Sequence, residues 1–120
     1  MVATNLTATP RAGQRVAPAT IKDVVRQIVD RFDPQRIILF GSHAYGQPGP
    51  ASDVDMLVIM DTPLKETEQA VHICQAIKYH FGLDLIVRKP STVDYRLALG
   101  DAFLAEILNK GKVLYERAND

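Results

Sequence analysis

One stretch decides the fold of this 120-residue chain: ILFGSHAYGQPGPASDVDMLV, residues 38–58. It contains two apolar runs, Arg36–Phe40 and Val54–Met60, which have the length and composition of buried strands. Between them, residues 42–46 predict a turn or the first turn of a helix, and Gln47–Ala51, with two prolines and a glycine, predicts a loop. The stretch therefore predicts two neighbouring buried strands with a turn between them.

Two carboxylates open the second of these strands. Side chains alternate along a strand, so Asp53 and Asp55 point to the same side. Carboxylates held this close repel each other unless a cation lies between them, and oxygen ligands suit Mg²⁺ or Mn²⁺. A pair of this spacing is, taken alone, more often a solvated strand end. Its place at the open end of a strongly apolar strand favours a metal site.

A third acid, Asp84, lies inside another apolar run, Leu83–Val87. An acid in a buried strand is costly unless it is paired or binds a metal. One reading is an ion pair with Arg88 or Arg36. The other is a third catalytic carboxylate that ligates a second metal and helps deprotonate an attacking hydroxyl, as suits in-line displacement at phosphorus.

Gly41 and Ser42 follow the first strand directly. A glycine at this point lets the backbone turn sharply and approach a ligand closely. Backbone N–H groups at a helix start, together with a hydroxyl, form a phosphate cradle. By itself the pair is equally an ordinary turn, and it gains meaning from its place one loop before the acids.

The rest of the chain predicts four helices and two strands. Apolar residues at helical spacing, with proline or glycine near the ends, predict helices over residues 18–32, 65–81, 91–99 and 102–109. Gly82 is expected to end the second helix and Ser91 to cap the third. The apolar runs Leu83–Val87 and Val113–Tyr115 predict strands. This order predicts an α+β fold, a small mixed sheet with helices packed mainly on one face.

Length and composition limit the classes of protein to which this chain can belong. The chain has room for one domain, residues 18–120, after a flexible arm over 1–17 that is rich in Thr, Ala, Pro and Gly. Lys and Arg total 14, as do Asp and Glu, which argues against a stable nucleic-acid binder.

No apolar run approaches the roughly 18 residues of a membrane span. The single cysteine, Cys74, excludes an internal disulfide; we expect a small buried core residue there and a cytoplasmic protein.

Together these motifs resemble the DNA polymerase β-like nucleotidyltransferase superfamily. Its pattern reads here as Phe40-Gly41-Ser42, then Asp53-x-Asp55, then Asp84. The wider shape, residues 39–46 followed by Ser52-Asp53-x-Asp55, and the ending Gly111–Glu116 are similar to the minimal nucleotidyltransferases, small prokaryotic proteins. The resemblance covers residues 21–117.

The resemblance implies a set of site residues. Asp53, Asp55 and Asp84 would be catalytic and hold Mg²⁺, two ions in all, with Mn²⁺ as an alternative. The residues implied to contact the phosphates of ATP are Gly41, Ser42 and Ser52. Tyr45 departs from the family, which often has an arginine there, so its role stays open, as does that of His43, for which an exposed position is expected.

The resemblance also implies a reaction and a partner. AMP passes from ATP to a hydroxyl, and pyrophosphate leaves. Many minimal nucleotidyltransferases are encoded beside a HEPN-domain protein in toxin–antitoxin pairs, where the acceptor is a tyrosine of the HEPN ribonuclease toxin, which is silenced. The alternatives are an adenylyltransferase of a small hydroxyl compound, such as an antibiotic, and a non-enzymatic antitoxin that acts by binding. So short a chain has little beyond a nucleotide-binding unit, so its acceptor site should be open, which favours a protein acceptor.

Overall fold

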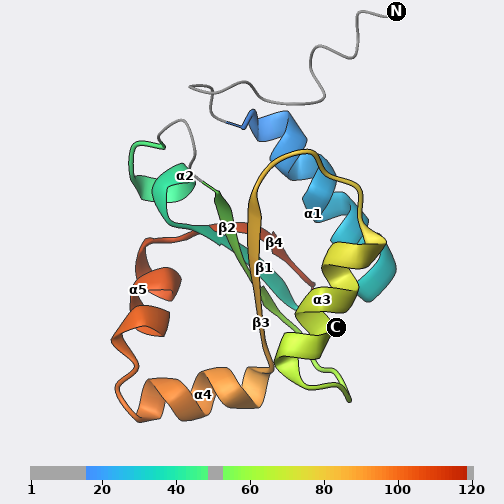
Figure 1. Cartoon of the computed structure of the whole chain (residues 1–120). Coiled ribbons are helices and arrows are strands. Elements are labelled where there is room, and N and C mark those ends of the chain that lie inside the picture. Colours follow the sequence, from blue (N-terminus) through green and yellow to red (C-terminus); the bar gives the residue numbers. More distant parts are fainter. Residues whose placement is uncertain (1–15, 49–52, 119–120) are drawn as a thin grey trace, which may run out of the picture.

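The computed structural model describes residues 16–48 and 53–118. Their elements, in chain order, are α1 (Pro18–Phe32), β1 (Arg36–Phe40), α2 (Ser42–Tyr45), β2 (Val54–Ile59), α3 (Glu66–Ala76), β3 (Leu83–Arg88), α4 (Pro90–Ala98), α5 (Ala102–Lys110) and β4 (Lys112–Glu116). The strands form one four-stranded mixed sheet in the order β3-β2-β1-β4 (Figure 1). β1 is antiparallel to β2 and β4, and β2 is parallel to β3. The α+β class and the mixed sheet are confirmed. Most of the arm expected over residues 1–17 lies outside the described residues.

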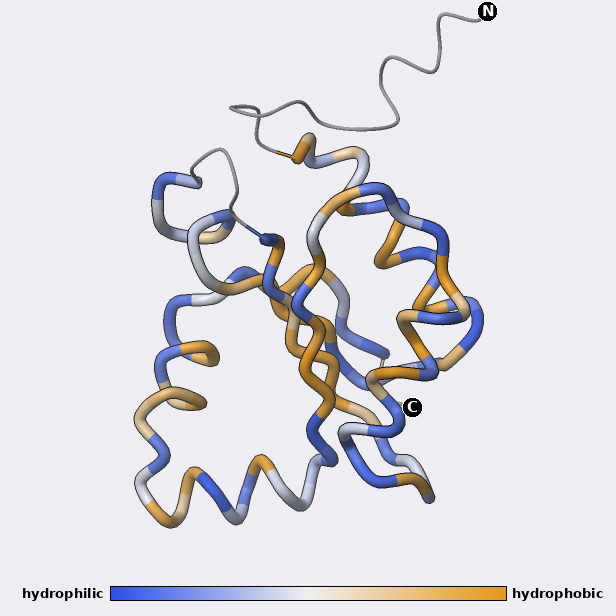
Figure 2. Tube along the Cα trace, viewed as in Figure 1, coloured by the Kyte–Doolittle hydropathy of each residue, from blue (hydrophilic) through white to orange (hydrophobic). Residues whose placement is uncertain are grey.

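The strands are mostly apolar (Figure 2). Because side chains alternate along them, the sheet has an apolar core on each face. The larger core lies against α1 and α3 and includes the fully buried Ile28, Ile37, Met56, Val58 and Ile73. The smaller core lies against α5 and the start of α4 and includes Ile38, Leu57, Val93, Leu104 and Ile107. Helices thus cover both faces of the sheet, with the larger core on the side of α1 and α3.

α3 is shorter than its sequence pattern predicts. It ends at Ala76 rather than Phe81, and Ile77 is extended, with φ −104° and ψ 159°. The cause is a contact with α1: the N–H of Lys78 donates to the side-chain oxygen of Gln27 (2.8 Å), and the Gln27 amide donates to the carbonyl of Lys78 (2.9 Å). In a longer helix the backbone N–H and C=O of Lys78 would bond within the helix, whereas here they bond to Gln27. The helix therefore ends before Gly82, which is not its last residue as predicted.

α4 begins one residue before the predicted cap. Pro90 occupies its first turn and Lys89, extended at φ −73° and ψ 150°, is the capping residue in place of Ser91. Proline suits this position because its missing N–H would have no partner within the helix. The N–H of Lys89 donates to Glu66 at the start of α3 (2.7 Å), which fixes the helix start from a distant element.

Cys74 packs half-buried against the larger core, and burial raises the pKa of its thiol. This agrees with a core role. Among the helices within residues 16–48 and 53–118, none has the length and apolar character to cross a membrane.

The Gln27 contact yields a test of the fold. In the Gln27→Ala variant the backbone of Lys78 loses both hydrogen bonds, so we expect the free energy of unfolding in urea to fall by roughly 1–2 kcal/mol. Gln75→Ala, at an exposed position on α3, is the control and should change it by less than about 0.5 kcal/mol. Equal losses in both variants would show that the contact does not hold this loop.

Candidate active site

The structure brings the three predicted aspartates to one end of one sheet face. In the parallel register of β2 and β3, Asp55 lies beside Asp84. Their neighbours Val54, Met56 and Leu85 point into the larger core, so both carboxylates point to the opposite face, the one that carries α5. Asp53 immediately precedes β2 at the same end. This is also the end where β1 stops and α2 begins (Figure 1).

The carboxylates repel one another. Partial burial, followed by the negative charges of Asp84 and Asp53, raises the pKa of Asp55, while His43 acts in the opposite direction. Such a cluster is stabilised by a cation. No three His, Cys, Asp or Glu side chains within the described parts of the chain form a ready-made metal site. An all-oxygen set still fits Mg²⁺, which usually takes one or two carboxylates and completes its shell with substrate phosphates and water.

Asp84 is exposed rather than buried, so the prediction of an acid inside a buried strand is wrong. The physical reason is that β3 is an edge strand of the sheet, which the apolar run Leu83–Val87 did not reveal. The alternative of an ion pair also fails, because Arg88 pairs with Glu66 and Arg36 with Glu116, each at 3.9 Å. What the structure does supply is the position of Asp84 beside Asp55.

Two glycines allow the carboxylates to lie against the backbone. Gly41 caps α2 with φ 75° and ψ −158°, and a Cβ on it would overlap Oδ2 of Asp55. A Cβ on Gly82 would likewise overlap Oδ1 of Asp53, and the carbonyl of Gly82 accepts the N–H of Val54 (2.9 Å). The sequence pattern points to Gly41 as a site residue but not to Gly82, whose signal is its place just before the strand of Asp84.

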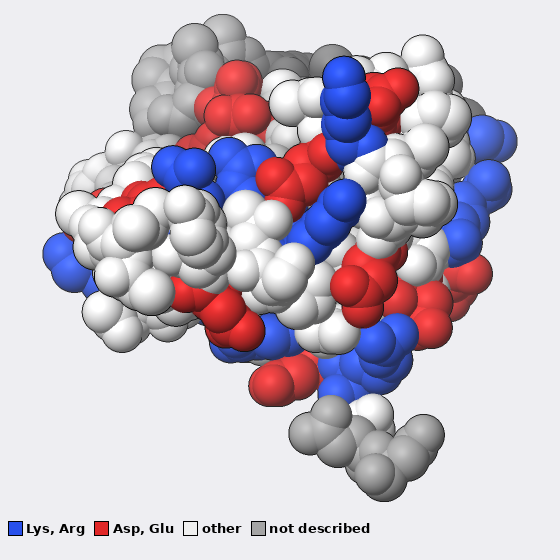
Figure 3. Space-filling model, turned by 90° about the horizontal axis from the view of Figure 1, so that it is seen from below, with Lys and Arg blue, Asp and Glu red and all other residues white. Residues whose placement is uncertain are grey.

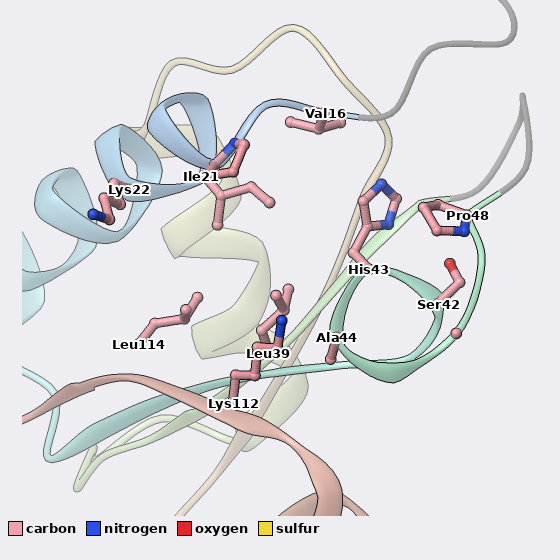
Figure 4. Close-up of a pocket in the computed structure, with 12 residues that line it drawn as sticks. Val16, Ile21, Lys22, Leu39, Ser42, His43, Ala44, Pro48, Lys112 and Leu114 are labelled. Carbon is pink, nitrogen blue, oxygen red and sulfur yellow. The ribbon is translucent and has the colours of Figure 1, made fainter.

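A cavity of about 300 Å³ lies between α2 and the start of α1 (Figure 4). Ser42 and His43 line it together with apolar side chains of α1, β1 and β4, and none of the described residues around it is one of the three aspartates. Leu39 in its wall belongs to the larger core, so the cavity lies on the α1 side of the sheet.

The structure corrects one expectation about α2 and leaves two open. His43 was expected to be exposed, but both ring nitrogens are buried and without a hydrogen-bond partner among the described residues. Tyr45 is 44% exposed at the end of α2. Ser52, predicted to contact phosphate, lies outside the described residues.

Comparison with known proteins identifies the family. The family model described as "Polymerase beta, Nucleotidyltransferase" matches residues 21–120. The chain belongs to this nucleotidyltransferase family. It is 34% identical to MJ0141 of Methanocaldococcus jannaschii over 92 residues, which cover 75% of this chain and 86% of that protein. It is 26% identical to MJ0604 of the same organism over 97 residues, covering 79% and 94%. Both relatives are provisionally named protein adenylyltransferases.

A solved structure supports the fold of this nucleotidyltransferase. The crystal structure of a protein from Sulfolobus solfataricus, provisionally named a nucleotidyltransferase, superposes with a TM-score of 0.59 at 18% sequence identity. The match covers 82% of this chain and 79% of that one. Since the identity is low, this likeness speaks for the fold alone. The nucleotidyltransferase class itself rests on the family match.

The raised pKa of Asp55 predicts a stability cost at neutral pH. Folding raises the pKa of Asp55, so the folded protein holds this proton more tightly than the unfolded chain does. The stability that the protonated carboxyl contributes is therefore complete at low pH, and it is lost as pH rises through the pKa of the folded state. Without divalent cations, Asp55→Asn should therefore raise Tm by roughly 2 °C at pH 7 and leave it nearly unchanged near pH 3. Thermal unfolding followed by circular dichroism at both pH values measures this. A lower Tm at pH 7 would contradict the repulsion.

The fit of Gly82 predicts a loss of activity without loss of fold. In Gly82→Ala the Asp53 carboxylate must swing away, so we expect nucleotidyl transfer to slow about ten-fold or more. The free energy of unfolding should change by less than about 1 kcal/mol, because only an exposed side chain moves. His80→Ala, at an exposed position in the same loop, is the control. Unchanged transfer in Gly82→Ala would show that Asp53 need not lie where the structure has it.

Proposed function

We propose that this nucleotidyltransferase moves AMP from ATP to a hydroxyl of a protein. The observation that carries the proposal is the gathering of Asp53, Asp55 and Asp84 at one open end of the sheet, beside the Gly41-Ser42 turn. The provisional names of MJ0141 and MJ0604 support a protein as the acceptor.

Each carboxylate has a part in this reaction. Asp53 and Asp55 would hold Mg²⁺, with Asp84 completing the set for a second ion; the metal would supply positive charge against the triphosphate. The hydroxyl oxygen forms a bond to the α-phosphorus, the bond from that phosphorus to the oxygen bridging to the β-phosphate breaks, and pyrophosphate leaves with the electron pair. Asp84 accepts the proton of the hydroxyl, a role that its exposed place on an edge strand favours.

The openness of the site supports a macromolecular acceptor. Asp53 and Asp84 are both exposed, and β3 forms an edge of the sheet, so a bulky substrate can reach the carboxylates from that side. From the sequence resemblance, we propose that the acceptor is a tyrosine of a HEPN-domain ribonuclease toxin and that its modification makes this chain the antitoxin.

Transfer of a label tests the proposal. The protein is incubated with Mg²⁺, ATP labelled at the α-phosphorus, and a HEPN-domain protein, the proposed acceptor. We expect label on a tyrosine of that protein and release of pyrophosphate. Asp53→Asn and Asp55→Asn should each reduce transfer by at least about 100-fold. Asp94→Asn, an exposed acid on α4 away from the cluster, should not.

Three outcomes would overturn parts of this proposal. Label on an aminoglycoside but not on the protein would mean a small acceptor. Neutralisation of the toxin by Asp53→Asn as well as by the wild type would mean a binding antitoxin. No labelled product with either acceptor, while the proteins remain folded, would contradict the proposed transfer.

A further inference from the structure

Phe103 is a large aromatic side chain on α5 that remains 56% exposed. Its ring meets the buried ring of Phe40 edge to face, with centroids 5.8 Å apart and an interplanar angle of 85°. Phe40 is in turn the register partner of Asp55. A single side chain therefore lies between the ring of Phe103 and the carboxylate cluster, and that side chain holds the ring in place.

Phe103 lies over the same sheet face as the carboxylates. Leu57 follows Asp55 by one alternation of β2, and Ile86 follows Asp84 by one alternation of β3, so all four side chains point to this face. Phe103 lines a small hollow with Leu57 and Ile86. Arg88 and the Arg96–Asp101 ion pair also line this hollow, so the apolar side chains that follow the carboxylates on this face adjoin Phe103 on one side and charged groups on the other.

The size of this hollow limits how a ligand can use it. Its volume is about 50 Å³, too small for a purine. A flat ligand must therefore lie against the exposed part of Phe103 instead of entering beneath it. The cavity of about 300 Å³ beside His43 offers more room, but it lies on the α1 side, with β1 between it and the carboxylate face.

We propose that Phe103 stacks on the adenine of the bound ATP, an inference that rests on the proposed function. If the phosphates lie between the Gly41-Ser42 turn and the carboxylates, the base is one ribose beyond the α-phosphate. On this side Phe40 is the register partner of Asp55, and Phe103 packs on Phe40, so the exposed ring is the aromatic surface that follows the carboxylates. Stacking on an aromatic ring recognises any base by its π-face, so this contact favours nucleotide binding without a strong choice between ATP and GTP.

The exposed leucines at the end of α4 provide a matched control. Leu97 and Leu99 are 36% and 68% exposed near the α4–α5 corner, at the end of the molecule away from α2 (Figure 1). Seen from below, this corner forms a largely uncharged lobe, while charges of both signs are scattered over the rest of that side (Figure 3). Leu99→Ala therefore removes an exposed apolar group at the end of the molecule away from the carboxylates.

Calorimetric titration with two probes tests the stacking. The first probe is a non-hydrolysable ATP analogue with Mg²⁺, and the second is tripolyphosphate with Mg²⁺, which has no base. We expect Phe103→Ala to weaken binding of the analogue about ten-fold or more and to leave tripolyphosphate binding unchanged. Phe103→Tyr and Phe103→Trp should bind the analogue like the wild type, Phe103→Leu should resemble Phe103→Ala, and Leu99→Ala should change neither probe.

The outcomes separate this inference from the proposed function. Unchanged analogue binding by a folded Phe103→Ala, or an equal loss of both probes, would overturn the stacking. If Phe103→Ala does not fold, Phe103→Leu gives the same reading, since it keeps the apolar contact with Phe40. A wild-type protein that binds neither probe would overturn the proposed function and the stacking together. Selective loss of analogue binding, with no label reaching any protein, would uphold the stacking and refute the protein acceptor.

Discussion

The repulsion among three carboxylates at one end of the sheet is the constraint on which the site depends. The parallel register of β2 and β3 sets Asp55 beside Asp84, and the residue before β2 adds Asp53. Partial burial, followed by this crowding, raises the pKa of Asp55, the only one of the three that is partly buried rather than exposed. The repulsion within this cluster lowers the stability of the folded chain. A cation and a triphosphate bound there would raise that stability again.

The backbone near the cluster is shaped to hold these side chains. Gly41 and Gly82 come from different loops, yet each leaves the space that one carboxylate fills. The left-handed φ of Gly41 also turns the chain from β1 into α2, so one residue both ends the strand and admits Asp55. These two positions connect the turn after β1 with the start of β3, which explains why the site is formed only when β1, β2 and β3 are assembled.

The two faces of the sheet have different roles. The larger core, against α1 and α3, supplies most of the buried apolar surface and so most of the stability. The smaller core, against α5 and the start of α4, covers the opposite face incompletely and leaves the carboxylates and Phe103 accessible. The four-stranded sheet is therefore stabilised mainly through the face that carries α1 and α3. The thinner layer on the other face leaves the site open to substrates.

The sequence by itself determined the strands, the approximate helices and the pairing of Asp53 with Asp55, because alternation and helical spacing are local properties of the chain. It also carried the family pattern. It did not determine where α3 ends, because the partner of the Lys78 backbone is Gln27, a residue of another helix. Only the tertiary structure decided that β3 is an edge strand, that Asp84 is exposed beside Asp55, that Gly82 lies against Asp53 and that Phe103 packs on Phe40. Strand order and packing between distant segments fix these features, and no local pattern of residues records them.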